Sequence, residues 1–172
     1  MGKINAEQYL ESLIDSYQNL IYTICYRMVN DYFEAEDLTQ ETFLAAYRNL
    51  AAFDRQHEKA WLIRIARNKC LDVLRRSGKR EIIPSEEEFF LAVADQGESP
   101  EESVLNRQVQ EELRTFCEEL KPPYREVAVD YFCEELEPAV IARKRNKNLK
   151  TIQTQIYRAK DMLKKKYRKE RL

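Results

Sequence analysis

Apolar residues recur at intervals of three and four along most of this 172-residue chain, and this spacing limits its fold more than any other feature. The first such run extends from Tyr9 to Met28. Residues three and four apart lie on the same side of an α-helix, so the run predicts an amphipathic helix with one buried face. Glycine, which disfavours helices, occurs only three times. We therefore expect an all-α protein.

Local signals predict where the next two helices begin and end. Asp31 followed by Glu34 resembles an N-terminal capping box, and Gly78 is a favourable helix end. Residues 51–59 between the two helices are expected to form a loop. The helix after Asp31 is expected to bury Ala35, Leu38, Phe43, Ala46, Tyr47 and Leu50. The helix before Gly78 is expected to bury Trp61, Leu62, Ile65, Ala66, Cys70, Val73 and Leu74.

The helical periodicity is lost after residue 78, in an acidic stretch that contains a proline and a glycine. Such composition is typical of a linker between domains. Ser99 and Pro100 then form a strong helix start, because serine caps helices and proline suits the first helical position. The sequence therefore predicts two small helical domains, residues 1–80 and 99–172, joined by a flexible linker over residues 81–98.

The end of the chain has the layout of a helix-turn-helix. Pro138 is expected to begin a short helix, Asn146 suits the left-handed backbone of a tight turn, and Asn148 suits the cap of the next helix. A short helix, a tight turn and a basic amphipathic helix in succession are typical of DNA-binding modules. The last helix is expected to bury Leu149, Ile152, Ile156, Ala159 and Leu163.

Basic side chains gather in two blocks, although the net charge is only −1. Residues 58–80 carry eight basic and two acidic side chains, and residues 143–172 carry thirteen and two. Lys and Arg bind phosphate, and Asn, Gln and Arg can address base edges, so both blocks suit contact with DNA or RNA. The first block includes Arg64 and Arg67. For this block, an ordinary solvated helix face without a nucleic-acid partner is the alternative interpretation. Aromatic Trp61 near His57 and Lys59 favours unstacked, single-stranded bases.

The stretch "EAEDLTQETFLAAY" is acidic and unsuited to phosphate. Asp37, Gln40 and Glu41 share one face of the predicted helix. They form either a docking surface for a basic protein partner or a solvated helix side, and composition alone leaves both open.

Other functional classes find no support in the sequence. It contains no glycine-rich phosphate loop and no zinc-protease motif, so we expect neither an enzyme nor a cofactor. The four cysteines form no CxxC pair and His57 is the only histidine, so we expect no metal site. Cys25, Cys70 and Cys117 are expected to act as small apolar residues. Reduced thiols fit a cytoplasmic protein, which we expect here. No segment has the length and apolarity of a membrane span, so we expect no membrane insertion.

With these segments placed, the chain resembles the extracytoplasmic-function (ECF) sigma factors of bacterial RNA polymerase. "LIYTICYRMVNDYFEAEDLTQETFLAAYRNLAAFD" is similar to their regions 2.1 and 2.2, with "AEDLTQETFLAAYRNL" as its most specific part, and "AWLIRIARNKCLDVLRRSGKR" is similar to their regions 2.3 and 2.4. "LKPPYREVAVDYF" and "LKTIQTQIYRAKDMLKKKY" resemble region 4 and its recognition helix. The alternative from the residues alone is a free-standing helix-turn-helix regulator that dimerises through its N-terminal half.

The resemblance implies partners and residues. The partners are core RNA polymerase (the clamp helices of its largest subunit and the flap of the second largest), promoter DNA and, as a candidate, an anti-sigma factor. Residues implied for the clamp are Asp37, Gln40, Glu41 and Phe43. Residues implied for the minus-ten element are His57, Lys59, Trp61, Asn68, Lys69, Asp72, Arg75, Arg76, Lys79 and Arg80, with a flipped base held by the loop Asp54–Lys59. Residues implied for the minus-thirty-five element are Asn148, Lys150, Thr151, Gln153, Thr154, Tyr157, Arg158 and Lys160.

Region 4 departs from the family pattern at several positions: Val140, Arg145, Asn146, Lys147, Lys150, Gln153 and Gln155. Arg145 and Lys147 stand where apolar residues usually pack between the two helices. We therefore expect unusual packing of the helix-turn-helix and an altered preference at the minus-thirty-five element.

Overall fold

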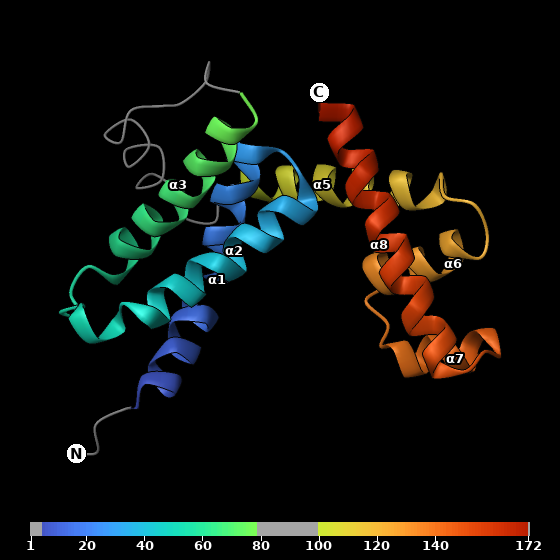
Figure 1. The fold of residues 1–172 in the computed structure, drawn as a ribbon, viewed down its shortest axis with the longest axis horizontal. Coiled ribbons are helices and arrows are strands. Elements are labelled where there is room, and N and C mark those ends of the chain that lie inside the picture. The colour runs from blue at the N-terminus through green and yellow to red at the C-terminus, as the bar shows by residue number, and fades with distance from the viewer. Residues whose placement is uncertain (1–4, 79–99, 172) are drawn as a thin grey trace. The chain divides into compact units, whose positions relative to one another are not determined.

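The computed structural model describes residues 5–78 and 100–171, and every regular element in these ranges is a helix (Figure 1). The all-α prediction is confirmed. The chain divides into two compact units, Met1–Gln96 and Gly97–Leu172. The predicted linker lies outside the described residues, so it and the predicted domain limits stay predictions. Within the described ranges, no helix has the length and apolarity needed to cross a lipid bilayer.

Three helices form the N-terminal unit: α1 (Ala6–Val29), α2 (Tyr32–Arg48) and α3 (Glu58–Arg76). Each packs against the other two, and a 3₁₀ turn, η1 (Leu50–Ala52), follows α2. Burial of apolar side chains is the main force that holds such a bundle together. Its largest fully buried side chains are Leu13, Ile21, Phe33, Leu38, Thr42 and Leu62.

The helix limits of this unit follow the local signals in the sequence. Asn30 ends α1 with a left-handed backbone (φ 55°), and Gly78 follows α3 in a similar conformation (φ 74°). One carboxylate oxygen of Asp31 accepts hydrogen bonds from the backbone N–H groups of Phe33 and Glu34 at 3.1 and 3.2 Å. These bonds satisfy amide groups that have no partner within the helix, so the predicted cap is confirmed.

The buried face of α2 differs in part from the prediction. Thr39 and Thr42 are buried, and their hydroxyls donate to the backbone oxygens of Ala35 and Leu38, at 2.7 Å in both cases. These internal bonds satisfy the hydroxyls and let threonine occupy core positions. Tyr47 is exposed, so its predicted burial is wrong.

Four helices and a π-helical turn form the C-terminal unit: α5 (Pro100–Glu118), α6 (Tyr124–Ala128), η2 (Val129–Cys133), α7 (Pro138–Arg145) and α8 (Leu149–Arg171). As predicted, α5 begins at Pro100. One apolar cluster joins α6, α7 and α8 beneath the turn of the helix-turn-helix, and its buried members are Val127, Ile141, Ala142 and Ile152.

The buried stripe of α8 lies further along the helix than predicted. Leu149 is exposed, which corrects the prediction, because the stripe starts one turn later at Ile152. It then extends to Tyr167, which is fully buried and meets Phe116 of α5 edge to face at a centroid distance of 4.6 Å. An edge-to-face pair is a favourable aromatic geometry, so this contact helps to hold α8 against α5.

Candidate nucleic-acid interface

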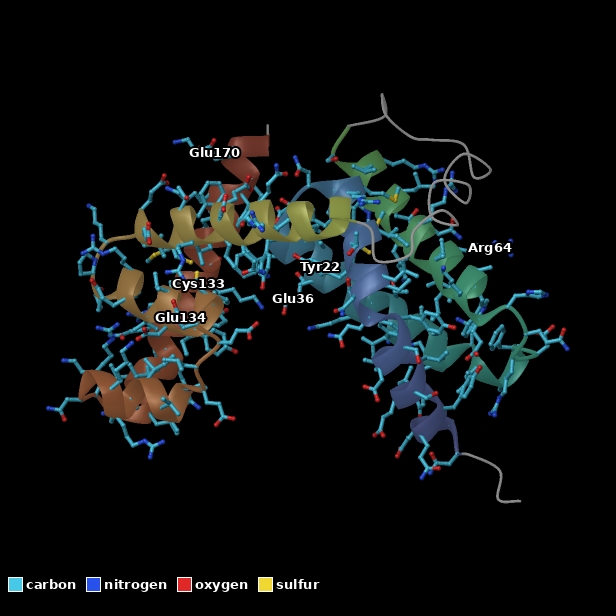
Figure 2. All side chains as sticks on the ribbon, turned by 180° about the vertical axis from the view of Figure 1, so that it is seen from behind. Tyr22, Glu36, Arg64, Cys133, Glu134 and Glu170 are labelled. Carbon is cyan, nitrogen blue, oxygen red and sulfur yellow. The ribbon has the colours of Figure 1, made fainter. Side chains whose placement is uncertain are left out.

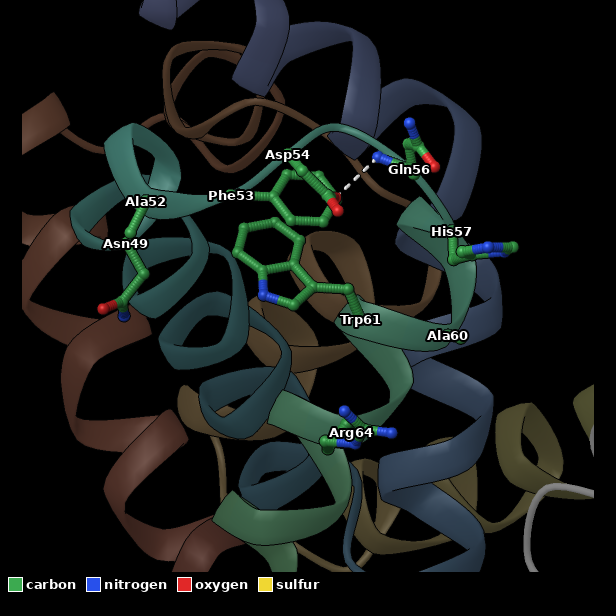
Figure 3. Close-up of a pocket in the computed structure, with 9 residues that line it drawn as sticks. All are labelled: Asn49, Ala52, Phe53, Asp54, Gln56, His57, Ala60, Trp61 and Arg64. Carbon is green, nitrogen blue, oxygen red and sulfur yellow. Dashed lines mark hydrogen bonds between the residues drawn. The ribbon is translucent and has the colours of Figure 1, made fainter.

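A hollow of about 660 Å³ lies where α3 begins (Figure 3). The end of α2, the turn η1, the loop after it and the first two turns of α3 provide its walls. Its lining combines aromatic, amide and charged side chains, a mixture that suits a planar polar ligand. The lining residues are Asn49, Ala52, Phe53, Asp54, Gln56, His57, Ala60, Trp61 and Arg64.

Two aromatic rings form one wall of this hollow. Phe53 and Trp61 stack with their centroids 3.8 Å apart and an interplanar angle of 5°. Figure 3 shows the two rings lying one on the other at the edge of the hollow. Trp61 is half-buried, so it is less buried than the core position that periodicity predicted, and part of its surface remains open. Aromatic faces of this kind are the platforms on which unpaired bases stack.

The loop that closes the hollow has an unusual backbone. Arg55 and His57 adopt left-handed conformations, with φ values of 63° and 56°. Residues with side chains rarely adopt this conformation, which costs free energy that neighbouring contacts must offset. Strain of this kind is concentrated at binding sites, so it adds weight to a functional interpretation of the loop.

Contacts with both neighbouring helices hold this loop. The Asp54 carboxylate accepts from the backbone N–H of Gln56 at 3.0 Å. The Arg55 guanidinium lies 4.3 Å from the centroid of the Tyr9 ring, a cation–π arrangement. The Tyr9 hydroxyl in turn donates to the Glu58 carboxylate at 2.6 Å. Tyr9 on α1 therefore connects the loop to the first turn of α3.

Burial and the hydrogen bond to Glu58 raise the pKa of Tyr9 to about 12, from an ordinary value of 10.0. The hydroxyl therefore stays protonated, and able to donate, throughout the neutral pH range.

The exposed face of α3 continues from the hollow. Arg64, Asn68 and Arg75 are exposed, at helical spacing from Trp61. Asp72 faces Arg75 at 3.8 Å, and both side chains are more than half exposed, so this ion pair contributes little to stability. Of the other residues expected at the minus-ten element, His57, Lys59 and Arg76 are exposed and Lys69 is half-buried. Lys79 and Arg80 lie outside the described residues.

A second, more apolar groove of about 300 Å³ lies between α1 and α2. Gln40 and Glu41 are exposed on α2, and Asp37 is half-buried beside them. Phe43 is only 6% exposed and lines the groove, so a partner can reach it only from the groove. The residues along the groove are Leu10, Ile14, Gln18, Thr39, Gln40, Phe43 and Leu44.

The α1 side of this groove was not predicted. Leu10 and Ile14 belong to the periodic apolar pattern, and only the packing of α1 against α2 shows that they border an open groove.

The helix-turn-helix of the C-terminal unit has the predicted turn. Asn146 ends α7 with φ 54°, and the Asn148 side-chain oxygen accepts from the backbone N–H of Thr151 at 2.7 Å. A shallow hollow of about 310 Å³ lies at the start of α8 between Asn148, Lys150, Thr151 and Thr154.

The outer face of α8 carries the residues expected to read DNA. Tyr157 is 77% exposed, an unusual exposure for so large a ring. Thr151 and Lys160 are half-buried at the edges of this face. The remaining members are exposed: Asn148, Lys150, Gln153, Thr154 and Arg158.

A buried carboxylate explains one departure from the family pattern. Asp130, in η2, is 2% exposed and accepts from Lys144 Nζ and Arg145 Nε, each at 2.9 Å. Arg145 therefore holds α7 by an ion pair at a position where apolar packing is usual. Lys147, by contrast, is exposed. Burial alone would raise the pKa of Asp130, but hydrogen bonds from Arg145 and Lys144 hold it below its ordinary value.

Comparison with known proteins identifies the family. The sequence model described as Sigma-70 region 2 matches residues 13–80. This segment includes all the residues that line the hollow at α3 and most of those that line the groove between α1 and α2. ECF RNA polymerase sigma factor SigW of Bacillus subtilis is 30% identical over 163 residues, which are 91% of this chain and 87% of that protein. The chain belongs to the ECF sigma factors.

A further relative of this sigma factor agrees with that membership. ECF RNA polymerase sigma factor BldN of Streptomyces coelicolor is 36% identical over 149 residues, which are 86% of this chain and 56% of that protein. Among solved structures, the RsbN–BldN complex includes a chain that is 28% identical, with coverage of 90% and 88% and a TM-score of 0.40. The sequence alone allowed a sigma factor or a free-standing regulator, and membership in this family favours the sigma factor.

Proposed function

We propose that this sigma factor binds core RNA polymerase through α2 and directs it to promoters through two DNA-contacting surfaces, one on each unit. The observation that carries the proposal is the hollow beside α3. It joins an aromatic wall and a strained loop to the start of an exposed basic helix face, inside the segment that matches Sigma-70 region 2.

In this proposal the hollow receives one unpaired base of the minus-ten element. Extruding a base costs a few kcal/mol, so a site that holds the extruded base favours strand separation. The open surface of the Phe53–Trp61 pair supplies stacking, and Asn49, Gln56 and Arg64 supply polar groups around it. DNA phosphates are then neutralised by basic side chains further along α3, namely Lys69, Arg75 and Arg76. Lys79 and Arg80 are proposed to extend this phosphate contact.

The groove between α1 and α2 is the proposed polymerase contact. An apolar centre with a polar rim is the ordinary anatomy of a protein interface. Here Leu44 and Phe43 supply apolar surface and Gln40 a polar group along the groove. Glu41 and Asp37, close to Gln40 on α2, are proposed to make its rim acidic. The occupant proposed from the family is the pair of clamp helices of the largest subunit, and an acidic rim calls for basic side chains on them.

The α7–α8 motif is the proposed contact with the minus-thirty-five element and with the flap of the second-largest subunit. Gln153 and Arg158 are exposed on α8 and have side chains that read adenine and guanine edges. We further propose that the protein catalyses no reaction, acts in the cytoplasm and is open to control by an anti-sigma factor.

Selection from a pool of random duplexes tests this proposal and needs no promoter chosen in advance. Core polymerase with the sigma factor, and the sigma factor alone, are each used to select duplexes from the pool. We expect the holoenzyme to enrich two short elements at a fixed separation and the free chain to enrich neither. Enrichment of the same sequences by the free chain would favour a regulator that works without polymerase. Failure of the holoenzyme to enrich any sequence would remove the proposal.

A further inference from the structure

The four cysteines form two close pairs, one in each unit. Cys25 and Cys70 belong to α1 and α3, and both are fully buried. Cys117 lies on α5 and is also fully buried, but its partner Cys133, at the end of η2, is only half-buried. All four are free thiols. The two pairs therefore differ mainly in whether one sulfur can be reached from solvent.

The Cys117 and Cys133 sulfurs lie 4.0 Å apart, within the range of a weak S–H···S hydrogen bond. A disulfide requires a separation of about 2.05 Å, so the sulfurs must approach by roughly 2 Å. The two cysteines are sixteen residues apart in sequence and lie on two packed elements, α5 and η2.

Charge around the pair favours Cys133 as the sulfur that reacts first. In the thiol form Cys133 donates the hydrogen bond to Cys117. Once ionised, Cys133 can only accept from Cys117, and this hydrogen bond and the nearby Arg114 guanidinium lower the pKa of Cys133, although partial burial and the carboxylates of Glu134 and Glu118 oppose them. Arg114 is itself fixed by Glu134, whose carboxylate accepts from its guanidinium at 2.7 Å. For Cys117, the hydrogen bond with Cys133 and burial raise the pKa. The thiolate is the nucleophile in thiol oxidation, so the reactive form is concentrated on the more exposed sulfur.

We propose that Cys117 and Cys133 form a reversible oxidation site for hydrogen peroxide. The Cys133 thiolate attacks one peroxide oxygen, the O–O bond breaks, and Cys133 becomes a sulfenic acid while hydroxide leaves. The Cys117 sulfur then attacks the Cys133 sulfur, the S–O bond breaks, and a disulfide and water form. In total two thiols lose two electrons and two protons, and peroxide becomes two molecules of water. Figure 2 shows Cys133 beside Glu134 in the C-terminal unit.

The product would join α5 to η2, the turn that also carries Asp130 and leads into the helix-turn-helix. Neither core packing nor the proposed polymerase and promoter contacts require this pair of thiols to be close. The role of a small apolar residue explains a cysteine at the buried position 117. It does not explain a cysteine at position 133, where the side chain is half-buried and lies beside an arginine.

Mass spectrometry of the full chain tests the proposal directly. The reduced protein is treated with hydrogen peroxide, its remaining thiols are alkylated, and it is digested with trypsin without reductant. Arg125 lies between the two cysteines, so the disulfide would join two separate tryptic peptides. We expect this joined pair, a loss of two hydrogen atoms from the intact mass, and full reversal by dithiothreitol.

Variants and the second pair provide matched controls. In Cys117→Ala, dimedone should trap a sulfenic acid on Cys133, and in Cys133→Ser the peroxide should leave Cys117 unmodified. The buried pair Cys25 and Cys70 should stay reduced in the folded protein and become alkylated only after denaturation. Oxidation of Cys25 and Cys70 at the same rate, or of Cys133 without any link to Cys117 in the wild type, would overturn the proposal.

Discussion

The buried carboxylate of Asp130 allows a quantitative prediction about the helix-turn-helix. Replacing Asp130 with alanine removes two hydrogen bonds, each 2.9 Å long, from the charged groups of Lys144 and Arg145. A hydrogen bond that involves a charged group contributes about 1.5–3 kcal/mol. Lys144 is 49% exposed and Arg145 is 35% exposed, so water replaces part of what each loses and the lower end applies. We therefore expect the free energy of unfolding of the C-terminal unit to fall by about 3 kcal/mol.

Urea unfolding followed by two probes measures this loss. The chain has one tryptophan, Trp61 in α3, so its fluorescence reports on the N-terminal unit, while circular dichroism reports on the helices of both. In Asp130→Ala we expect the dichroism transition of the C-terminal unit to move to lower urea, with an unchanged slope and an unchanged Trp61 transition. A loss below about 1 kcal/mol, the scale of an exposed ion pair, would refute the claim that this carboxylate holds α7.

The pH dependence of the same site checks the electrostatic cause. The pKa of Asp130 is lowered in the folded protein, so its charge contributes stability above the unfolded pKa of about 4. That contribution is lost as the pH falls through the folded pKa. The stability difference between wild type and Asp130→Asn should therefore be largest at neutral pH and shrink towards acid. A difference that stays constant from neutral pH into strong acid would point to lost packing instead.

Three further predictions concern the loop and the two proposed DNA-contacting surfaces. The pKa of Tyr9 is raised in the folded protein, so its contribution to stability is complete below pH 10 and is lost as the pH rises from 10.0 to about 12. Urea unfolding followed by Trp61 fluorescence should show this loss of stability at alkaline pH in wild type and not in Tyr9→Phe. Trp61→Ala should reduce strand opening by the holoenzyme roughly tenfold, since stacking on one base contributes about 1–3 kcal/mol. The fluorescence of 2-aminopurine placed in the selected promoter measures strand opening, which should recover in Trp61→Phe. Arg158→Ala should weaken promoter binding by about 1–3 kcal/mol and relax preference in the upstream element only, since the proposed base contact of α8 is there; an equal loss of core polymerase binding would show that α8 has been assigned wrongly.

Local chemistry made much of the fold predictable. Helix limits at Asn30, Asp31, Asn146 and Asn148 depend on backbone groups within four residues, so the sequence alone contains the relevant partners. The two faces of α8 follow in the same way from helical periodicity, although Leu149 is exposed and the buried stripe extends beyond Leu163 to Tyr167.

Contacts between distant segments could not be predicted in this way. Phe53 stands in a loop with no periodic pattern, and only the folded chain shows that it stacks on Trp61. Asp130 is a charged residue in an apolar helix pattern, and its burial depends on Lys144 and Arg145, more than a dozen residues later. The sequence indicated that Arg145 is unusual, but only packing shows the partner that stabilises it.

Polymerase binding through the α1–α2 groove is the central claim, and gel filtration with bacterial core RNA polymerase tests it most directly. The test variant is Gln40→Lys with Glu41→Lys, because both residues are exposed on α2, Gln40 lines the groove, and added positive charge opposes a basic partner. The control is Asp15→Lys with Ser16→Lys, which changes the charge equally at exposed positions of α1 that do not line the groove. We predict that wild type and control co-elute with core polymerase and that the test variant, folded by circular dichroism, does not. Co-elution of the test variant would contradict docking at this groove, and absence of wild type from the polymerase peak would contradict the proposed function as a whole.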